Sequence, residues 1–560
     1  MQSPYVRFNV TLEANMKKMN RLSMKSLILK SLLLSLLIVV GSMATTQAQS
    51  EKSDESLRKL LTAMQYIRMY YVDSIDEPEL VENAIVETLK ELDPHSMYIP
   101  KEDLREANEP LEGSFEGIGV TFQIYEDTIL VISPVPGGPS DKLGIMAGDK
   151  IVKINGEKAT GEDVDNQFVM DRLRGEKGTT VDVTIYRPSR DRMIEYTITR
   201  DKIPLNSIDA TFMASPDIGY IKLNRFSKTS TEEFENSIEQ LKEQGMKKLV
   251  LDLRGNSGGF LFSAVDLADQ FLPNKKLLVY TKGLKSYPRQ FYATSEGDFE
   301  EGDLVIMINE GSASASEIVA GAVQDWDRGI ILGRRSFGKG LVQQPFRLPD
   351  SSFIRLTTAK YYTPTGRGIQ RPYDEGTKEY YLEIRKRLEN GELFHADSIS
   401  FPDSLKYTTP QGRIVYGGGG IMPDIFTPWD STHLTDYFTD LIRKGVFNDF
   451  VLNYLDENRS ELLEEFPDIT AFKEGFRVSD EMYQLFIQSA EELDVEAEKD
   501  EIEKSTAFIK TRIRALIARN LWDVSAFFEI IVEIDNEYQK AVEILENGDV
   551  YETLGLKSDH

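Results

Sequence analysis

The sequence contains no cysteine, and this absence excludes several kinds of chemistry at once. A chain without cysteine forms no disulfide, has no lipid-anchoring cysteine and has no cysteine nucleophile. Histidine is nearly as scarce, with four in 560 residues, namely His95, His395, His433 and His560. None lies in an apolar, glycine-rich context near a candidate nucleophile, so a catalytic triad built on histidine is disfavoured. No His/Asp/Glu group has metal-ligand spacing, so neither a metal nor another cofactor is expected.

The sequence also lacks an excess of positive charge. Lys and Arg number 65 against 92 Asp and Glu, which gives a formal net charge of -27. Nucleic-acid binding needs a basic face to meet the phosphates, and no basic cluster is present. Nucleic acid is therefore excluded as a partner, and the acidity is interpreted as a contribution to solubility.

Long apolar runs are missing except near the start of the chain. Leu27 to Val40 is apolar apart from Lys30, Ser31 and Ser35, and it follows a basic stretch. Thr46-Gln47-Ala48 fits a small-x-small cleavage site, so residues 1–48 are predicted to be a signal peptide region. We expect export to the periplasm of a Gram-negative bacterium, with release from the cell as the second choice. An uncleaved signal anchor, which would make the protein membrane-associated, is the alternative to cleavage.

A serine-rich turn stands at the centre of the chain. Gly311-Ser312-Ala313-Ser314-Ala315-Ser316-Glu317 follows the apolar run 304–308 and precedes apolar residues at helical spacing. This pattern predicts a buried strand, a turn and a helix. A serine at such a turn lies near a helix N-terminus, whose amides and dipole favour a developing negative charge. Ordinary helix capping by these serines explains the same stretch equally well.

A lysine further along the chain favours the catalytic interpretation. Lys339 is flanked by Gly338 and Gly340, and in a strand Lys339 and Gln343 would point the same way. A lysine acts as a general base only when desolvation lowers its pKa. No acidic residue stands beside Lys339 in the sequence. With histidine so scarce, a serine–lysine arrangement is the economical choice.

Together the motifs GSASASE (311–317) and FGKGLVQQ (337–344) resemble those of the carboxyl-terminal processing protease, or tail-specific protease, family. The resemblance covers roughly residues 60 to 428. In that family the middle serine is the nucleophile, the base lysine lies 25 residues on and a glutamine lies four further. The resemblance implies that Ser314, Lys339 and Gln343 are the catalytic residues.

A glycine-rich turn follows the predicted strand 249–253. Arg254-Gly255-Asn256-Ser257-Gly258-Gly259 lacks the Gly-Lys-Ser/Thr ending of a nucleotide-binding loop. The family resemblance implies instead that its backbone helps to hold the oxyanion. It assigns one amide to Gly258 or Gly259 and the other to Ala315.

Residues 113–200 are rich in predicted strands and resemble a PDZ domain. Strand patterns occur at 129–132, 151–154 and 181–185, with a short helix over 139–145. PDZ domains bind a C-terminal peptide by strand addition, with the carboxylate held by a glycine loop. The matching loop here is Gly117-Ile118-Gly119-Val120. A small β-barrel without a ligand is the alternative.

The predicted fold class is a multidomain α/β protein. A β-rich PDZ-like domain (113–200) precedes an α/β protease body (201–428). Helical regions are predicted at 49–112 and 429–560. His95 follows a helix-breaking Leu92-Asp93-Pro94 and is expected to cap a turn, with a role as a ligand as the alternative.

Two functions are consistent with the sequence. The first is an exported serine endopeptidase that uses a Ser-Lys dyad and selects protein or peptide substrates by their free C-terminus. The second is an inactive peptide-binding scaffold that keeps the PDZ domain. The presence of Ser314, Lys339 and Gln343 favours the first. The sequence leaves a homo-oligomer or an adaptor protein open as further partners.

Overall fold

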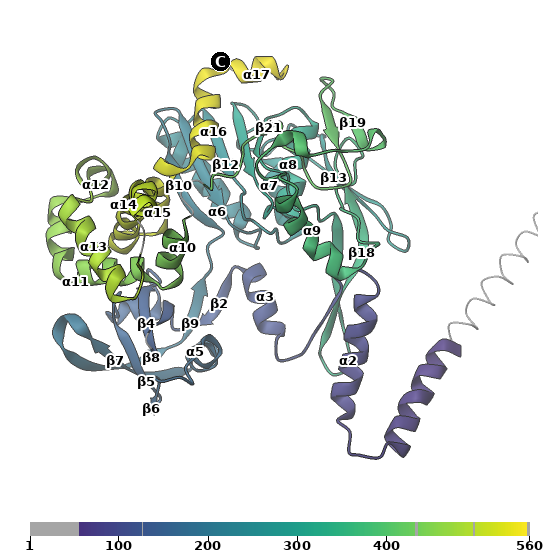
Figure 1. The fold of residues 1–560 in the computed structure, drawn as a ribbon. Coiled ribbons are helices and arrows are strands. Elements are labelled where there is room, and N and C mark those ends of the chain that lie inside the picture. The colour runs from purple at the N-terminus through teal and green to yellow at the C-terminus, as the bar shows by residue number, and fades with distance from the viewer. Residues whose placement is uncertain (1–54, 126, 432–434, 497–498, 557–560) are drawn as a thin grey trace, which may run out of the picture. The chain divides into compact units, whose positions relative to one another are not determined.

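The computed structural model describes residues 55–125, 127–431, 435–496 and 499–556 (Figure 1). The predicted signal peptide lies outside the described residues. The chain divides after Glu87 into two compact units. The first contains a helix over residues 55–70 and most of α2 (Glu77–Lys90). Within the described ranges, no helix is long and apolar enough to cross a membrane.

The second unit contains a small sheet built from residues of the PDZ-like region. Its strand order is β3-β4-β5-β7-β8, with β6 paired to β5. The strands are β3 (Val120–Tyr125), β4 (Thr128–Pro134), β5 (Lys150–Ile154), β6 (Glu157–Lys158), β7 (Thr180–Arg187) and β8 (Arg192–Thr199). The helices α4 (Pro139–Lys142) and α5 (Asn166–Leu173) complete it, and β2 (Ser114–Gly117) pairs with β9 (Asp201–Pro204) at its base. The predicted strands at 129–132, 151–154 and 181–185 are all present.

A six-stranded sheet forms the centre of the protease body. Its order is β10-β11-β12-β15-β16-β21, and every pair is parallel except β10–β11. The strands are β10 (Ile208–Met213), β11 (Ile218–Leu223), β12 (Lys248–Asp252), β15 (Leu304–Ile308), β16 (Ile330–Gly333) and β21 (Ile425–Phe426). Because the strands are parallel, the segments after β12, β15 and β16 emerge at one edge of the sheet.

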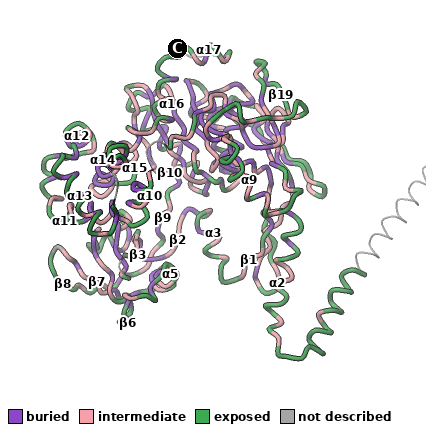
Figure 2. The backbone as a smooth tube through the Cα atoms, in the orientation of Figure 1, coloured by how far each residue is buried: buried purple, intermediate pink, exposed green. Residues whose placement is uncertain are grey.

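Both faces of this sheet are covered, so its strands are almost continuously apolar. One face packs against α6 (Ser230–Glu243), α7 (Leu261–Asp269) and α8 (Ala315–Asp325). The other face packs against α16 (Asn536–Asn547) and α17 (Asp549–Thr553), through side chains that include Ile544 and Tyr551. Figure 2 shows the buried backbone concentrated in these layers. Helices α16 and α17 are therefore part of the core of the protease body.

A second sheet lies beside the first and carries the lysine motif. Its order is β1-β18-β13-β14, and β17 pairs with β18. The strands are β1 (Met97–Ile99), β13 (Leu277–Lys282), β14 (Arg289–Tyr292), β17 (Leu341–Arg347) and β18 (Phe353–Tyr362). The hairpin predicted around residues 349–352 is formed by β17 and β18. Residues 97–99 form a strand where the sequence predicted a helical region, because β18 offers a pairing edge that sequence periodicity does not reveal.

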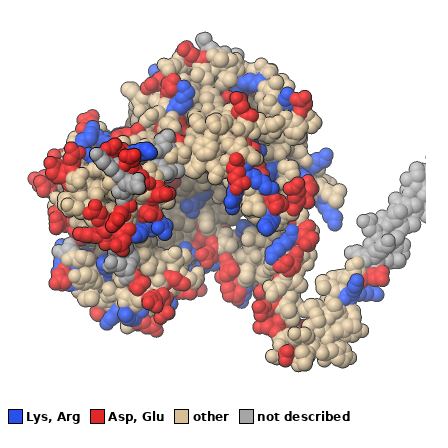
Figure 3. Space-filling view, in the orientation of Figure 1, with Lys and Arg blue, Asp and Glu red and all other residues tan. Residues whose placement is uncertain are grey.

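The remaining helices form a bundle with its own core. They are α10 (Asp436–Arg443), α11 (Val446–Glu465), α12 (Ile469–Gly475), α13 (Asp480–Glu492), α14 (Lys499–Leu521) and α15 (Val524–Ile531). Leu452 of α11 packs on Leu130 and Ile132 of β4. On the face drawn in Figure 3, acidic side chains gather over α11 to α13. Three further segments of the second compact unit lie outside this bundle. They are α3 (Leu104–Glu112), α9 (Thr377–Glu389) and the hairpin of β19 (Lys406–Thr408) and β20 (Ile414–Tyr416).

Candidate active site

Ser314 stands at the junction of a buried strand and a helix, as the sequence predicts. It follows β15 through the turn 309–313 and is the N-cap residue of α8. Its backbone φ is 54°, in the left-handed region that a non-glycine residue seldom occupies. Strained residues of this kind cluster at functional sites. The side chain is half-buried, and the first amides of α8 begin at Ala315.

The other two serines of the turn have structural roles. The Ser312 hydroxyl donates to the Leu253 carbonyl at 2.8 Å and accepts from the Asn309 amide at 2.9 Å. The Ser316 hydroxyl donates to the Asn256 carbonyl at 2.8 Å. Both serines are fully buried. Ser314 is thus the serine of the three that retains access to a substrate.

Lys339 and Gln343 lie together, although not by the route that strand alternation suggests. The Lys339 ammonium nitrogen lies 3.2 Å from Gln343 Oε1. Lys339 precedes β17, which begins at Leu341, and a register shift separates Val342 from Gln343. The expectation that residues 339, 341 and 343 share one face of a regular strand is therefore wrong, while the contact between Lys339 and Gln343 is present.

Burial is the main influence on Lys339. Desolvation lowers the pKa of its amine, and the nearby Arg355 guanidinium lowers it further. Glu317 and Asp93 act in the opposite direction, since a nearby negative charge favours the protonated amine. These two carboxylates are remote from Lys339 in sequence, which is why the local sequence shows no acid beside it. The net effect is a lowered pKa, as a general base requires.

Glu317 connects the serine and lysine segments. Its buried carboxylate accepts hydrogen bonds from the Ser314 amide at 2.7 Å and the Lys339 amide at 2.9 Å. It also accepts from the Gly338 amide at 2.7 Å and the Ser336 hydroxyl at 2.6 Å. Burial raises the pKa of Glu317, and these donors counteract the rise. The Ser-x-x-Glu spacing of a capping box could have revealed this residue, which sequence reasoning missed.

Tyr361 provides a second connection and was also missed. Its buried hydroxyl lies 2.9 Å from the Ser314 carbonyl oxygen and 2.6 Å from that of Lys339. No local signal marks this residue, because it reaches the site from the far strand of a hairpin. Glu317 and Tyr361 together fix the backbones of the candidate nucleophile and base relative to each other.

The segment before β1 holds Gln343 in place. The Gln343 amide nitrogen donates to the His95 carbonyl. Asp93 caps this turn by accepting from the amides of His95 and Ser96, both at 2.8 Å. The expectation that His95 itself caps the turn is wrong. Its ring is hydrogen-bonded to the Tyr380 hydroxyl at 2.8 Å, and burial, with Lys339 nearby, lowers the pKa of the ring to about 4.

The candidate oxyanion amides are close to the serine, but they are not equivalent. Gly258 has a φ of 104°, and a Cβ there would lie 2.8 Å from the Cβ of Ser314 and 2.9 Å from the Ala315 nitrogen. Its amide donates to Asn256 Oδ1 at 2.8 Å and is therefore occupied. In the described part of the chain nothing accepts a hydrogen bond from the Gly259 amide, and Gly259 is exposed. Of the two glycines, Gly259 is the better candidate to act with Ala315.

The predicted carboxylate loop, Gly117 to Val120, connects β2 to β3. The Ile118 carbonyl accepts from the amide and the hydroxyl of Ser140, and the Gly119 carbonyl accepts from the Val135 amide. The loop is therefore fixed from behind, and Gly119 has a φ of 73°. Among the described residues, the amides of Ile118 and Gly119 have no acceptor. Two amides in such a turn can hold a carboxylate.

Over the residues that the structure covers, no group of three or more His, Asp or Glu side chains could hold a metal ion. The strand–turn–helix serine, the half-buried lysine and the PDZ-like sheet thus define the class of a serine peptidase with a peptide-binding module.

Comparison with known proteins supports this class. The profile of peptidase family S41 matches residues 217–378, and that of the PDZ domain matches 117–198. Residues 38–103 match the N-terminal domain of the activating protease CtpB, and 437–523 match a family of unknown function.

The proteins that resemble the chain include two curated relatives and one solved structure. The carboxy-terminal-processing protease of Bartonella bacilliformis is 36% identical over 342 residues, which cover 60% of this chain and 78% of the relative. The carboxy-terminal processing protease CtpB of Bacillus subtilis is 33% identical over 366 residues, covering 65% and 74%. The photosystem II D1 C-terminal processing protease is 30% identical, covering 55% of this chain and 82% of that one at a TM-score of 0.32. The chain belongs to the carboxy-terminal processing proteases of peptidase family S41.

Proposed function

We propose that the protein is an exported endopeptidase in which Ser314 and Lys339 form a catalytic dyad. The observation that carries this proposal is that one buried carboxylate, that of Glu317, holds the backbones of both residues. Glu317 accepts hydrogen bonds from the backbone amides of Ser314 and Lys339, and burial lowers the pKa of the Lys339 amine. A serine and a lysine whose backbones share one acceptor, with the pKa of the lysine lowered, suit nucleophilic catalysis without histidine.

In the proposed reaction the Ser314 hydroxyl attacks the peptide carbonyl while neutral Lys339 accepts its proton. The tetrahedral intermediate collapses, and Lys339 returns the proton to the leaving amine. Lys339 then accepts a proton from the water that attacks the acyl-enzyme, and the released serine hydroxyl regains it. Gln343 orients the lysine through the 3.2 Å contact. The amides of Ala315 and Gly259 stabilise the oxyanion, with each such donor contributing about 2.7–4 kcal/mol.

Substrate choice is assigned to the PDZ domain. We infer that the amides of Ile118 and Gly119 bind the free carboxylate of a substrate tail, which extends along β3 as an added strand. Val120, Phe122 and Ile124 pack partly exposed against the domain core and would contact apolar side chains of that tail. The preferred substrates are therefore proteins with a free, apolar C-terminus.

The proposed location is the periplasm, with release outside the cell as the second choice. It depends on the basic and apolar stretches of residues 16–48, which have the order of a secretory signal.

The test is cleavage of casein, or of a protein with an apolar C-terminus, by the wild type and by Ser314→Ala. We expect Ser314→Ala to abolish cleavage without changing the unfolding temperature or tail binding. Cleavage by Ser314→Ala at the wild-type rate would refute the dyad. Failure of the folded wild type to cleave any such substrate, while it still binds their tails, would favour the inactive scaffold.

A further inference from the structure

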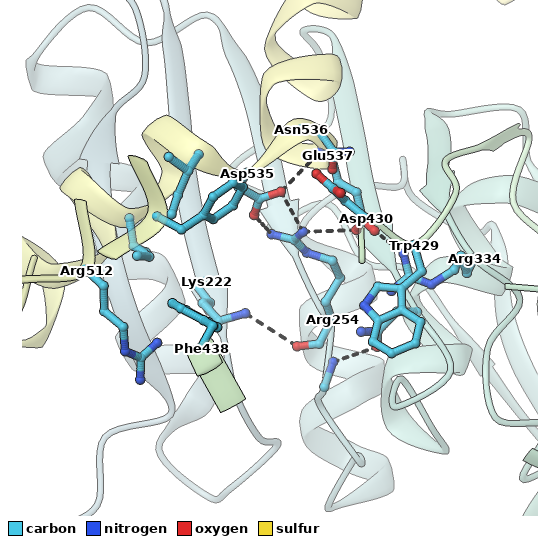
Figure 4. Close-up of a pocket in the computed structure, with 15 residues that line it drawn as sticks. Lys222, Arg254, Arg334, Trp429, Asp430, Phe438, Arg512, Asp535, Asn536 and Glu537 are labelled. Atoms are coloured by element: carbon cyan, nitrogen blue, oxygen red, sulfur yellow. Dashed lines mark hydrogen bonds and ion pairs between the residues drawn. The ribbon is translucent and has the colours of Figure 1, made fainter. Parts of the chain in front are cut away.

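An ion-pair cluster joins the start of α16 to the glycine turn. Arg254 follows β12 and is the first residue of that turn, and its side chain is 15% exposed. Its Nε lies 3.0 Å from Asp252 Oδ1. Its Nη2 lies 2.6 Å from Asp535 Oδ2 and its Nη1 lies 3.0 Å from Glu537 Oε2 (Figure 4). Asp535 caps α16 and Glu537 lies in its first turn. One guanidinium thus connects the protease sheet to acidic residues 281 and 283 positions further along the chain.

The same helix also reaches the other two active-site segments. Arg334 follows β16 and leads into the lysine segment, and its side chain is 5% exposed. Its Nη1 contacts Glu537, and its Nε lies 2.9 Å from Glu310 Oε2, just before the serine turn. The carboxylate of Glu537 therefore bridges two arginines that stand at the base of the glycine turn and of the lysine segment.

Hydrogen bonds connect the three segments to one another. Asn309 Oδ1 accepts from the Gly255 amide at 2.9 Å, and the Ala313 amide donates to the Asn256 carbonyl at 3.0 Å. The Phe337 amide donates to the Ser312 carbonyl at 2.9 Å. Because these bonds join the three segments, we expect a shift at the base of one segment to displace the other two.

On one side the ion-pair cluster faces a cavity and not closely packed side chains. Arg254, Arg334 and Glu537 line a cavity of about 420 Å³, whose other walls include Phe438 and Arg512 (Figure 4). Buried ion pairs add little net stability because of their desolvation cost, but their hydrogen bonds are directional and define geometry. Around Arg254 the pairing is strong: burial opposes charge there, yet Asp252 and Asp535 hold the pKa of the guanidinium well above its usual range.

We propose that Glu537, assisted by Asp535, is a positioning residue for proteolysis. Its carboxylate holds Arg254 and Arg334, and through them it keeps the candidate oxyanion amide, nucleophile and base in reacting geometry. Helix α16 is thus required for turnover as well as for the core. This inference rests on the proposed roles of Ser314 and Lys339.

The experiment measures kcat and KM of the full-length chain on a short chromogenic peptide, with active sites counted by a fluorophosphonate. Glu537→Gln keeps the side-chain size and removes the bridging charge. We expect kcat per labelled site to fall roughly 10- to 100-fold with KM nearly unchanged, since small displacements of reacting groups have effects of this size. Glu543→Gln is the matched control, because Glu543 is an exposed residue of the same helix that pairs only with Lys540 among the described residues.

A second variant keeps the inference testable if Glu537→Gln does not fold. Asp535→Asn retains the helix cap, because asparagine caps as well as aspartate, but loses its charge toward Arg254. We expect a smaller fall in kcat at unchanged KM, since Asp535 is the more exposed of the two acids. Wild-type kcat per labelled site in folded Glu537→Gln, or in Asp535→Asn when the former is unfolded, would overturn the positioning role. Either result would leave the dyad intact, whereas retained activity of Ser314→Ala would refute the dyad itself.

Discussion

At the scale of single residues, the sequence motifs named a candidate nucleophile, base and orienting glutamine, whose catalytic roles stay a prediction. The scarcity of histidine favoured a serine–lysine pair, and the family resemblance implied Ser314, Lys339 and Gln343. The structure brings Lys339 and Gln343 into contact. Glu317 was visible as a capping-box glutamate but was not recognised as a connection to the lysine. Tyr361 and the His95 carbonyl could not be predicted, because they reach the site by tertiary packing alone.

The first residue-scale prediction concerns pH. Below its pKa Lys339 is protonated and cannot accept the Ser314 proton, so the cleavage rate should rise with pH as the amine loses its charge. Arg355 lowers this pKa, and Arg355→Gln should therefore move the rising limb to higher pH. The measurement is kcat/KM against pH for both enzymes. Arg347→Gln is the control, because Arg347 is exposed at the end of β17. An unchanged or lower midpoint in Arg355→Gln would contradict the account.

The second residue-scale prediction concerns the buried carboxylate of Glu317. Each carboxylate oxygen of Glu317 accepts two hydrogen bonds. In Glu317→Gln an NH2 group replaces one of these oxygens, and it cannot accept a hydrogen bond from the two donors that face it. Unsatisfied buried donors cost about 1–3 kcal/mol, so we expect the unfolding free energy to fall by roughly this amount. Turnover per folded molecule should fall as well, because the Ser314 and Lys339 backbones lose their common acceptor. Denaturant titration together with kcat measures both, and a variant with wild-type kcat would show that this connection is dispensable.

At the scale of elements, periodicity predicted the buried strands and most helices. Periodicity failed where pairing with a neighbouring strand decides whether a segment becomes a strand. Residues 97–99 become a strand only because β18 offers an edge, and Lys339 stays outside β17, whose pairing begins two residues later. The PDZ strands were predicted because each has a regular apolar pattern bounded by glycine turns.

The element-scale prediction concerns the loop before β3. If the Ile118 and Gly119 amides bind the substrate carboxylate, a protein substrate and its C-terminally amidated twin should differ in KM. The amidated form should be the weaker substrate because it lacks the negative charge. Competition kinetics with both forms in one reaction measures the ratio of kcat/KM. A short peptide that does not reach the loop serves as the control, and equal cleavage of the twins would argue against tail recognition.

At the scale of the whole molecule, the sequence separated a protease body at 201–428 from a helical region at 429–560. The structure shows that α16 and α17, at the end of that region, cover one face of the protease sheet. The apolar face of an amphipathic helix predicts that the helix is buried but does not identify the surface that it packs against. The packing of α16 and α17 on the protease sheet therefore could not be predicted. The fold class itself, with a PDZ domain and a protease body, is confirmed.

The whole-molecule prediction concerns export. Expressed in a Gram-negative host, the protein should be recovered from the periplasmic fraction with a mature N-terminus at Gln49, because Thr46-Gln47-Ala48 fits a signal-peptidase site. N-terminal peptide mass spectrometry of the fraction measures this. Ala48→Phe should block processing, since a bulky residue does not fit such a site. A full-length chain in the cytoplasm would contradict export, and a full-length chain in the membrane fraction would indicate an uncleaved anchor.

The account as a whole depends on Ser314 and Lys339 acting together. The most direct measurement is the rate at which a fluorophosphonate labels the wild type, Lys339→Arg and the exposed control Lys360→Arg, with the modified residue mapped by mass spectrometry. We predict labelling of Ser314 at a rate that rises with pH, a loss of at least about 100-fold in Lys339→Arg and no change in Lys360→Arg. Near wild-type labelling of Lys339→Arg, or a label on a different serine, would contradict it.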